Sequence, residues 1–101
     1  NNYKAALIDG EIMKKLKLSI AKKKVIFDEN KKFFIEDSNI ILNSIEVYAI
    51  NNSGKEIPLL HPLYHFMKSN ENKYQVVIRN RRKDIKYVVY YDVVIEHEVE
   101  F

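Results

Sequence analysis

The stretch IKYVVYYDVVIEHEVEF, residues 85–101, alternates between two kinds of side chain along its whole length. Successive side chains on a β-strand point to opposite faces, so a period of two predicts a strand with two different faces. The odd positions are apolar or aromatic apart from one histidine: Ile85, Tyr87, Val89, Tyr91, Val93, Ile95, His97, Val99 and Phe101. The even positions include Lys86, Asp92, Glu96, Glu98 and Glu100. We expect the fold to be built around this long strand.

Length and composition indicate a single domain over residues 1–101. Typical domains contain roughly 100–150 residues, and 47% of these 101 residues are hydrophobic, which is enough for an ordinary core. The chain has no cysteine, so disulfides, thiolate metal sites and a cysteine nucleophile are excluded.

Two further absences narrow the function. Glycine occurs only at Gly10 and Gly54, which excludes the glycine-rich loops that hold the phosphates of nucleotides. No apolar run approaches the roughly 20 residues of a membrane-spanning helix, so we expect no membrane partner. The abundance of Lys, Asn and Ile is typical of a low-GC genome, such as that of a bacterium, an archaeon or a virus.

The N-terminal segment has two interpretations. Asp9-Gly10 is a dipeptide favoured in two-residue hairpin turns, and residues 15–20 alternate as a strand. The alternative is a helix, because Ile12, Met13, Leu16 and Ile20 share one helical face. Leu18 lies off that helical stripe but on the apolar face of the strand, which favours the hairpin.

Further strands follow along the chain. Residues 25–27 and 33–35 are interpreted as a hairpin with a polar turn, and residues 40–50 as a strand. Gly54 supplies the left-handed conformation of a tight turn, after which residues 56–59 return beside that strand. Residues 74–79 form a strand with Tyr74, Val76 and Ile78 on one face, and the loop 80–84 leads into the final strand.

Residues 61–69, HPLYHFMKS, are predicted to form a short helix. Proline is accepted at a first helical position, and Leu63, Phe66 and Met67 fall on one side. The fold class is therefore mainly β, a small antiparallel β-sandwich or barrel with one or two short helices. The alternative is an α+β fold of the OB type, a five-stranded barrel with a helix between its third and fourth strands.

Neither a metal site nor a catalytic site is predicted. His61 and His65 are four residues apart, a spacing that places two metal ligands on one helical face. No glutamate of an HEXXH motif accompanies them, and nothing in the sequence brings His97 close. Glu96, Glu98 and Glu100 are interpreted as a solvated strand face that discourages edge pairing. No serine lies in a nucleophile motif, so we expect no enzyme, no metal and no cofactor.

A basic loop offers one partner class. It contains Arg79, Arg81, Arg82 and Lys83, and thus all the arginines of the chain. Arginines beside tyrosines bind single-stranded nucleic acid in small β-barrels. The net charge is only +3, and charged loops are common because loops are solvated. Nucleic-acid binding through residues 79–83 is therefore the alternative hypothesis.

The leading hypothesis concerns the even face of the final strand. Val88, Tyr90 and Val94 make this supposed solvent face partly apolar, and Val77 takes the equivalent role on the strand that we expect to face it. Such a face is either covered by a second layer or forms a contact surface. We predict a non-enzymatic structural or interaction protein with protein partners or self-assembly. A subunit of a larger assembly, such as a phage or viral particle, fits the size and the low-GC composition and would place the chain in a virion or in the cytoplasm.

Overall fold

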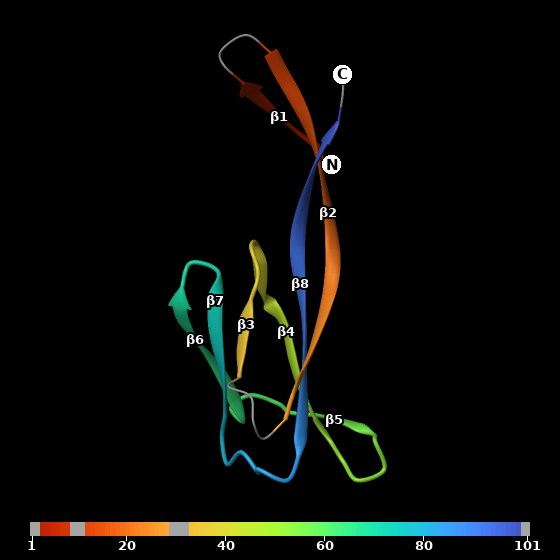
Figure 1. Cartoon of the computed structure of the whole chain (residues 1–101), viewed down its shortest axis with the longest axis vertical. Helices are drawn as coiled ribbons and strands as arrows, with labels where there is room; N and C mark the ends of the chain where they lie inside the picture. Colours follow the sequence, from red (N-terminus) through yellow and green to blue (C-terminus); the bar gives the residue numbers. More distant parts are fainter. Residues whose placement is uncertain (1–2, 9–11, 29–32, 100–101) are drawn as a thin grey trace.

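Two antiparallel β-sheets make up the fold, which we describe from a computed structural model covering residues 3–8, 12–28 and 33–99 (Figure 1). The described strands are β1 (Tyr3–Ile8), β2 (Ile12–Phe27), β3 (Phe34–Glu36), β4 (Ile40–Ile50), β5 (Glu56–Pro58), β6 (Tyr64–Asn70), β7 (Lys73–Ile78) and β8 (Lys86–Val99). The mainly β prediction is confirmed, and these residues contain no helix. Accordingly, no described helix could cross a membrane.

The predicted final strand, β8, lies inside the larger sheet, whose strand order is β1-β2-β8-β4-β5. It pairs with β2 on one side, from Lys15 opposite Val99 to Phe27 opposite Tyr87, and with β4 on the other. Both partners come from distant parts of the sequence. The strand that precedes it, β7, belongs to the other sheet, so β7 and β8 do not form the hairpin that their closeness in sequence suggests.

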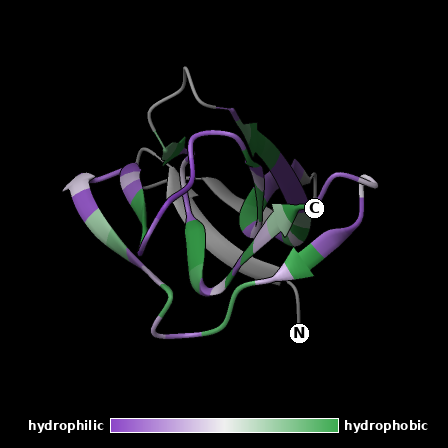
Figure 2. Cartoon of the chain, turned by 90° about the horizontal axis from the view of Figure 1, so that it is seen from below, coloured by the Kyte–Doolittle hydropathy of each residue, from purple (hydrophilic) through white to green (hydrophobic). Residues whose placement is uncertain are grey.

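The core lies between the two sheets. On β8 the odd positions face it as predicted, and four of them are at most 4% exposed: Tyr87, Val89, Tyr91 and Val93. The other buried members of this core come from the remaining elements: Phe27, Phe33, Ile35, Ile45, Val47, Tyr64 and Val76. Figure 2, which looks along the long axis, shows hydrophobic residues on strands of both sheets.

The smaller sheet, in the order β3-β7-β6, covers this face of the larger one. The predicted apolar face of β7, with Tyr74, Val76 and Ile78, is the face that packs on the core. The rings of Phe27 and Phe33 stack with centroids 4.5 Å apart where β2 leads toward β3. The two sheets stay separate, so the architecture is an open two-layer one and the closed-barrel alternative is wrong.

Two hydroxyl groups join the elements around the core. The hydroxyl of Tyr64 on β6 donates to the carbonyl oxygen of Ile45 on β4 at 3.4 Å. The hydroxyl of Tyr91 on β8 donates to the carboxylate of Asp37, which lies in the turn between β3 and β4. Burial, followed by this hydrogen bond, raises the pKa of Tyr91 above the ordinary tyrosine value.

The helix predicted over residues 61–69 is wrong. A turn closed by a hydrogen bond from Leu63 N–H to the Leu60 carbonyl contains a cis His61–Pro62 bond, and the chain then enters strand β6. Pairing with β7 places Tyr64 opposite Ile78 and Phe66 opposite Val76, on the face toward the core. Burial of every second residue therefore outweighs the short helical stripe that Leu63, Phe66 and Met67 suggested.

Two of the predicted hairpins have opposite outcomes. The N-terminal hairpin is confirmed, because β1 pairs with β2 from Tyr3 opposite Lys17 to Ile8 opposite Ile12, and the helix alternative is wrong. The turn at Asp9-Gly10 lies outside the described residues. The hairpin of residues 25–35 is wrong, since β2 pairs with β8 whereas β3 pairs with β7. The chain crosses between the sheets at this point instead of turning back within one.

A β-bulge interrupts the predicted strand of residues 40–50. Ile41 is opposite Asp92 and Glu46 is opposite Tyr90, so four residues of β4 face a single residue of β8. The Ser44 hydroxyl accepts a hydrogen bond from Asp92 N–H at 2.8 Å and donates one to the Ile41 carbonyl at 2.6 Å. The bulge changes which residues face the core: Ile40 packs against it, whereas the register puts Ile41 on the outer face with Asp92.

Replacing Ser44 with alanine should lower the free energy of unfolding by about 1 kcal/mol, because the N–H of Asp92 loses its acceptor. Urea denaturation measures this change. The matched control is Asn43→Ala, since Asn43 is an exposed residue of the same bulge. Equal effects of the two substitutions would mean that the hydroxyl of Ser44 does not hold the bulge.

Beyond the body of the fold, the larger sheet continues as a single layer. We call this part the arm: β1, residues 12–20 of β2 and residues 94–99 of β8. It extends past β4 and the smaller sheet (Figure 1), because β4 begins its pairing with β8 at Ile40 opposite Val93. The molecule is 57 Å long and 27 by 23 Å across, with a radius of gyration of 17.7 Å. A compact chain of this length has a radius of gyration of about 13 Å.

Candidate interaction surfaces

The residues of the predicted contact surface do not all lie together. Val88, Tyr90 and Val94 share the outer face of β8, the face that points away from the smaller sheet. Val77 lies on β7 in the smaller sheet, opposite His65 of β6. The structure therefore separates Val77 from the other three. Two outer faces, one on each sheet, take the place of the single surface that the sequence suggested.

Val88 is fully buried, although it is on the outer face of the larger sheet. Its direct neighbours on that face are Ile26 of β2 and Tyr48 of β4. The Tyr48 and Tyr90 rings meet edge to face, with centroids 5.5 Å apart. No second layer of backbone is needed here, because large side chains from the adjacent strands enclose the valine.

Tyr90 is held in a network of charged groups. Its hydroxyl donates to the carboxylate of Glu56 at 2.7 Å, and this hydrogen bond raises its pKa, with a smaller contribution from burial. The ammonium groups of Lys24 and Lys22 lie 5.6 and 5.9 Å from its ring centroid. The hydroxyl of Tyr48 donates to Glu46 at 2.9 Å, which raises the pKa of Tyr48. The tyrosine hydroxyl groups on this half of the outer face are therefore paired within the chain.

The outer face of the arm is different in character. Leu18, Ile20 and Val94 line an open hollow of about 430 Å³, together with the adjacent Lys17 and Ser19. Ile20 is 67% exposed, and the register places Val94 opposite it and Glu96 opposite Leu18. Leu18 and Val94 are half-buried. An exposed large apolar side chain that adjoins other apolar side chains is typical of a contact surface. The sequence alone indicated Val94 as part of a contact surface but not Ile20 or Leu18. Only the register of β2 with β8 brings the three residues together.

The four cations of the basic loop have different environments. The Arg81 guanidinium carbon lies 3.7 Å from the centroid of the Phe33 ring, and its Nη2 donates to the Asp28 carbonyl at 3.1 Å. Arg82 makes a bidentate pair with Asp84, at 2.9 and 3.2 Å. Arg79 and Lys83 are exposed. Two of the four residues that were predicted to bind nucleic acid, Arg81 and Arg82, therefore contact groups of the same chain.

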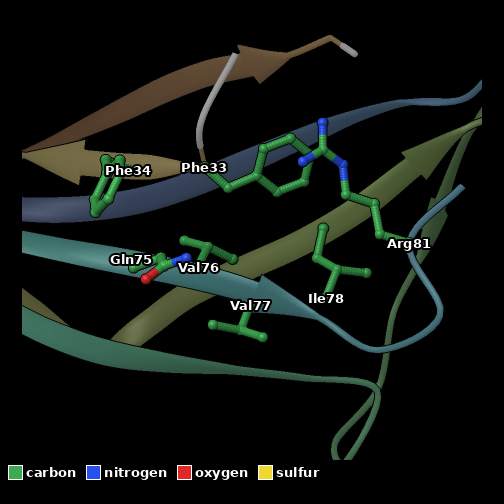
Figure 3. Close-up of a pocket in the computed structure, with 7 residues that line it drawn as sticks. All are labelled: Phe33, Phe34, Gln75, Val76, Val77, Ile78 and Arg81. Atoms are coloured by element: carbon green, nitrogen blue, oxygen red, sulfur yellow. The ribbon is translucent and has the colours of Figure 1, made fainter. Parts of the chain in front are cut away.

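A second open groove, of about 470 Å³, lies along β7 beside this loop (Figure 3). The groove is lined by Arg81 and the ring of Phe33, and by residues of β7 that include Gln75, Val77 and Ile78. Figure 3 shows the Arg81 guanidinium beside the Phe33 ring. Most of the described residues that line the groove are apolar, and Arg81 is the one charged residue among them.

Arg81→Ala should lower the free energy of unfolding by about 0.5–1 kcal/mol, because it removes the cation over the Phe33 ring. Lys83→Ala, a neighbouring exposed cation, should leave the free energy of unfolding unchanged. Urea denaturation of both variants compares them. A loop that serves only to bind an external anion would instead show no difference in stability between the two.

The histidines are dispersed through the fold. The ring of His61 packs on Tyr64 with centroids 4.4 Å apart, while His65 is exposed on β6. His97 lies on the arm, where its Nε2 is 3.0 Å from the Ser19 hydroxyl. Within residues 3–8, 12–28 and 33–99, no cluster of three histidine, aspartate or glutamate side chains could hold a metal ion. Glu100 of the predicted acidic face lies outside these ranges, whereas Glu96 and Glu98 are exposed.

Comparisons with known proteins provide no relative for this chain: no family model, no curated protein and no solved structure matches it.

Proposed function

We propose that this chain is a non-enzymatic interaction module that joins a larger assembly through the outer face of its arm. The observation that carries the proposal is the apolar group on the outer face of the arm, in which exposed Ile20 adjoins half-buried Leu18 and Val94. A sheet of two or three strands is marginally stable in water unless another layer packs against it. A partner that covers this face would supply the second layer that the body of the fold already has.

The accessible surface supports the same proposal. The chain exposes 7471 Å², whereas a compact monomer of 12.0 kDa exposes about 6,000 Å². The excess of about 1,500 Å² compares with the roughly 800 Å² that each partner buries in a standard protein interface. An elongated shape thus leaves enough surface for a stable contact.

The expected partner is a protein and not a nucleic acid. Nucleic-acid binding through the loop of residues 79–83 has less support, because the Arg81 guanidinium lies over the Phe33 ring and donates to the Asp28 carbonyl of the same chain. That the assembly is a phage or viral particle rests on the small size and the low-GC composition of the chain. The interaction function itself is supported by the outer face of the arm and by the elongated shape of the chain.

Site-specific photocrosslinking tests this function. A benzophenone amino acid replaces Ile20 in the chain, which is expressed in the cell that produces it, and illumination should join it covalently to a protein. The matched control places the same group at Ser53, an exposed residue of the loop between β4 and β5, where no protein crosslink is expected. A chain that crosslinks to no protein from position 20, or equally from both positions, overturns the proposal.

A further inference from the structure

The outer face of the arm has an ordered arrangement of charge along its length. Leu18, Ile20 and Val94 form its apolar centre. On the side toward the body, β2 contributes Lys22 and Lys24; on the side toward the tip, β8 contributes Glu96 and Glu98. All of these residues have even numbers, and the register places them on one face. On the described part of this face, the lysines therefore lie toward the body, where Asp92 and Glu56 accompany them, and the two glutamates lie toward the tip, with the apolar residues between.

The exposed charges at the two ends have opposite signs. The side chains of Lys22 and Lys24 are 59% and 50% exposed, and their partners Asp92 and Glu56 are less exposed, at 27% and 33%. The distances within these ion pairs are long, 3.7 and 3.9 Å. Ion pairs of this exposed kind are weak, so both ammonium groups remain able to contact a partner. Glu96 and Glu98 are exposed residues on the opposite side of the apolar centre.

This face becomes self-complementary about a two-fold axis that lies just outside the Ile20–Val94 pair, parallel to the sheet and perpendicular to the strands. In a two-fold interface the same patch contacts itself, so a residue on one side of the axis meets residues on the other side. Two arms packed face to face with antiparallel strands would bring the two apolar centres together. Lys22 of each copy would lie over the Leu18–Glu96 pair of the other, and Lys24 would approach Glu98.

We propose that the partner that covers the arm is a second copy of this chain, bound face to face about that two-fold axis. The proposal rests on the proposed interaction function and names its partner. One such contact needs about 800 Å² from each copy, which the excess surface of the elongated chain can supply. The second arm then provides the missing layer, at the roughly 10 Å separation of packed sheets.

The geometry of one chain makes the pairing testable by charge exchange. Lys24 is opposite Tyr90, and Glu98 is eight residues further along β8. At a rise of about 3.3 Å per residue, the two side chains are separated by roughly 26 Å along the arm. This is about three times the Debye length at physiological salt, which is about 8 Å. A favourable effect of one residue on the other must therefore arise between copies.

Sedimentation equilibrium of the purified full chain is the test. Loading concentrations range from about 1 µM to about 1 mM, which covers the dissociation constants expected of a weak dimer. The wild-type chain should form a dimer, and Ile20→Lys should abolish it. Lys24→Glu and Glu98→Lys should each raise the dimer dissociation constant by about tenfold, because each places two like-charge contacts in the interface. The double variant Lys24→Glu/Glu98→Lys should return the dissociation constant to within about threefold of the wild-type value.

The control is Lys23→Glu, which makes the same charge change on the other face of β2, opposite Tyr91. It should leave the dissociation constant unchanged, and circular dichroism of each variant checks that it is folded. A wild-type chain that stays monomeric throughout overturns this inference, as does a dimer that survives Ile20→Lys or a double variant no better than the single ones. A heterologous protein crosslinked from position 20 beside a monomeric purified chain would uphold the interaction function while overturning the second-copy inference.

Discussion

Replacing Phe27 with alanine should lower the free energy of unfolding by about 3–5 kcal/mol, the usual cost of deleting a fully buried aromatic ring. Phe27 is 2% exposed and stacks on Phe33, whose ring also carries the Arg81 guanidinium. It ends the long strand β2 at the point where the chain crosses to the smaller sheet. Its removal would open a cavity between the layers and loosen that crossing. Urea denaturation at neutral pH provides the measurement.

The matched control is Phe34→Ala. Phe34 has the same ring but lies on β3 at intermediate exposure, with the Lys73 ammonium 4.6 Å from its ring centroid. Its loss should cost at most about 1 kcal/mol. If the two phenylalanines proved equally important, the core would not lie where this fold places it.

Tyr91→Phe should lower the free energy of unfolding by about 2 kcal/mol, the scale of a hydrogen bond to a charged group. Tyr91 is 2% exposed, and the substitution keeps its buried ring. It removes only the donor to Asp37, and with it one link between β8 and the turn that joins β3 to β4. Tyr48→Phe is the control, because Tyr48 donates to Glu46 at an exposed site two residues away. That change should cost less than about 0.5 kcal/mol.

The raised pKa of Tyr91 also predicts how stability depends on pH. In the unfolded chain this tyrosine ionises near pH 10, whereas burial and the bond to Asp37 make the folded state hold its proton more tightly. The resulting contribution to stability is complete below pH 10 and is lost as the pH rises above it. Urea titrations between pH 8 and about 11 should show stability falling more steeply for the wild type than for Tyr91→Phe. Parallel curves for the two proteins would contradict the assigned environment of Tyr91.

Local patterns predicted the elements that bury alternate residues over a long stretch. The alternation of residues 85–101 identified β8 and its core face, because a strand packed on one side needs an apolar residue at every second position. The same reasoning identified β7 with its inward Tyr74 and Val76. It also correctly preferred the N-terminal hairpin, on the evidence of Leu18.

Short segments were ambiguous for a physical reason. The seven residues of β6 contain too few positions to separate a period of 2 from one of 3.6. Leu63, Phe66 and Met67 therefore suggested a helix. Packing against β7 decides the outcome, since it buries Tyr64 and leaves Met67 55% exposed. The bulge near Ser44 was equally hidden, because it depends on a hydrogen bond to a residue 48 positions away.

Strand partners were the main source of error in the candidate surface. Closeness in sequence suggested that β7 faces β8, which placed Val77 beside Val88. The actual partners of β8 are β2 and β4, and no local pattern encodes such distant pairing. This register explains both why Val88 is enclosed and why Ile20 adjoins Val94 on the arm.

If a protein partner covers the face that contains Ile20, a thiol at position 20 should be shielded from alkylation in the cell. The chain has no cysteine, so Ile20→Cys and a Ser53→Cys control each carry one reactive thiol. Alkylation rates are compared between the purified chain at nanomolar concentration and the same chain in the cell that produces it. The alkylation rate at position 20, relative to that at position 53, should be at least about tenfold lower in the cell than in the purified chain. Equal relative rates in the two settings would show that no partner covers this face and that it stays open to solvent.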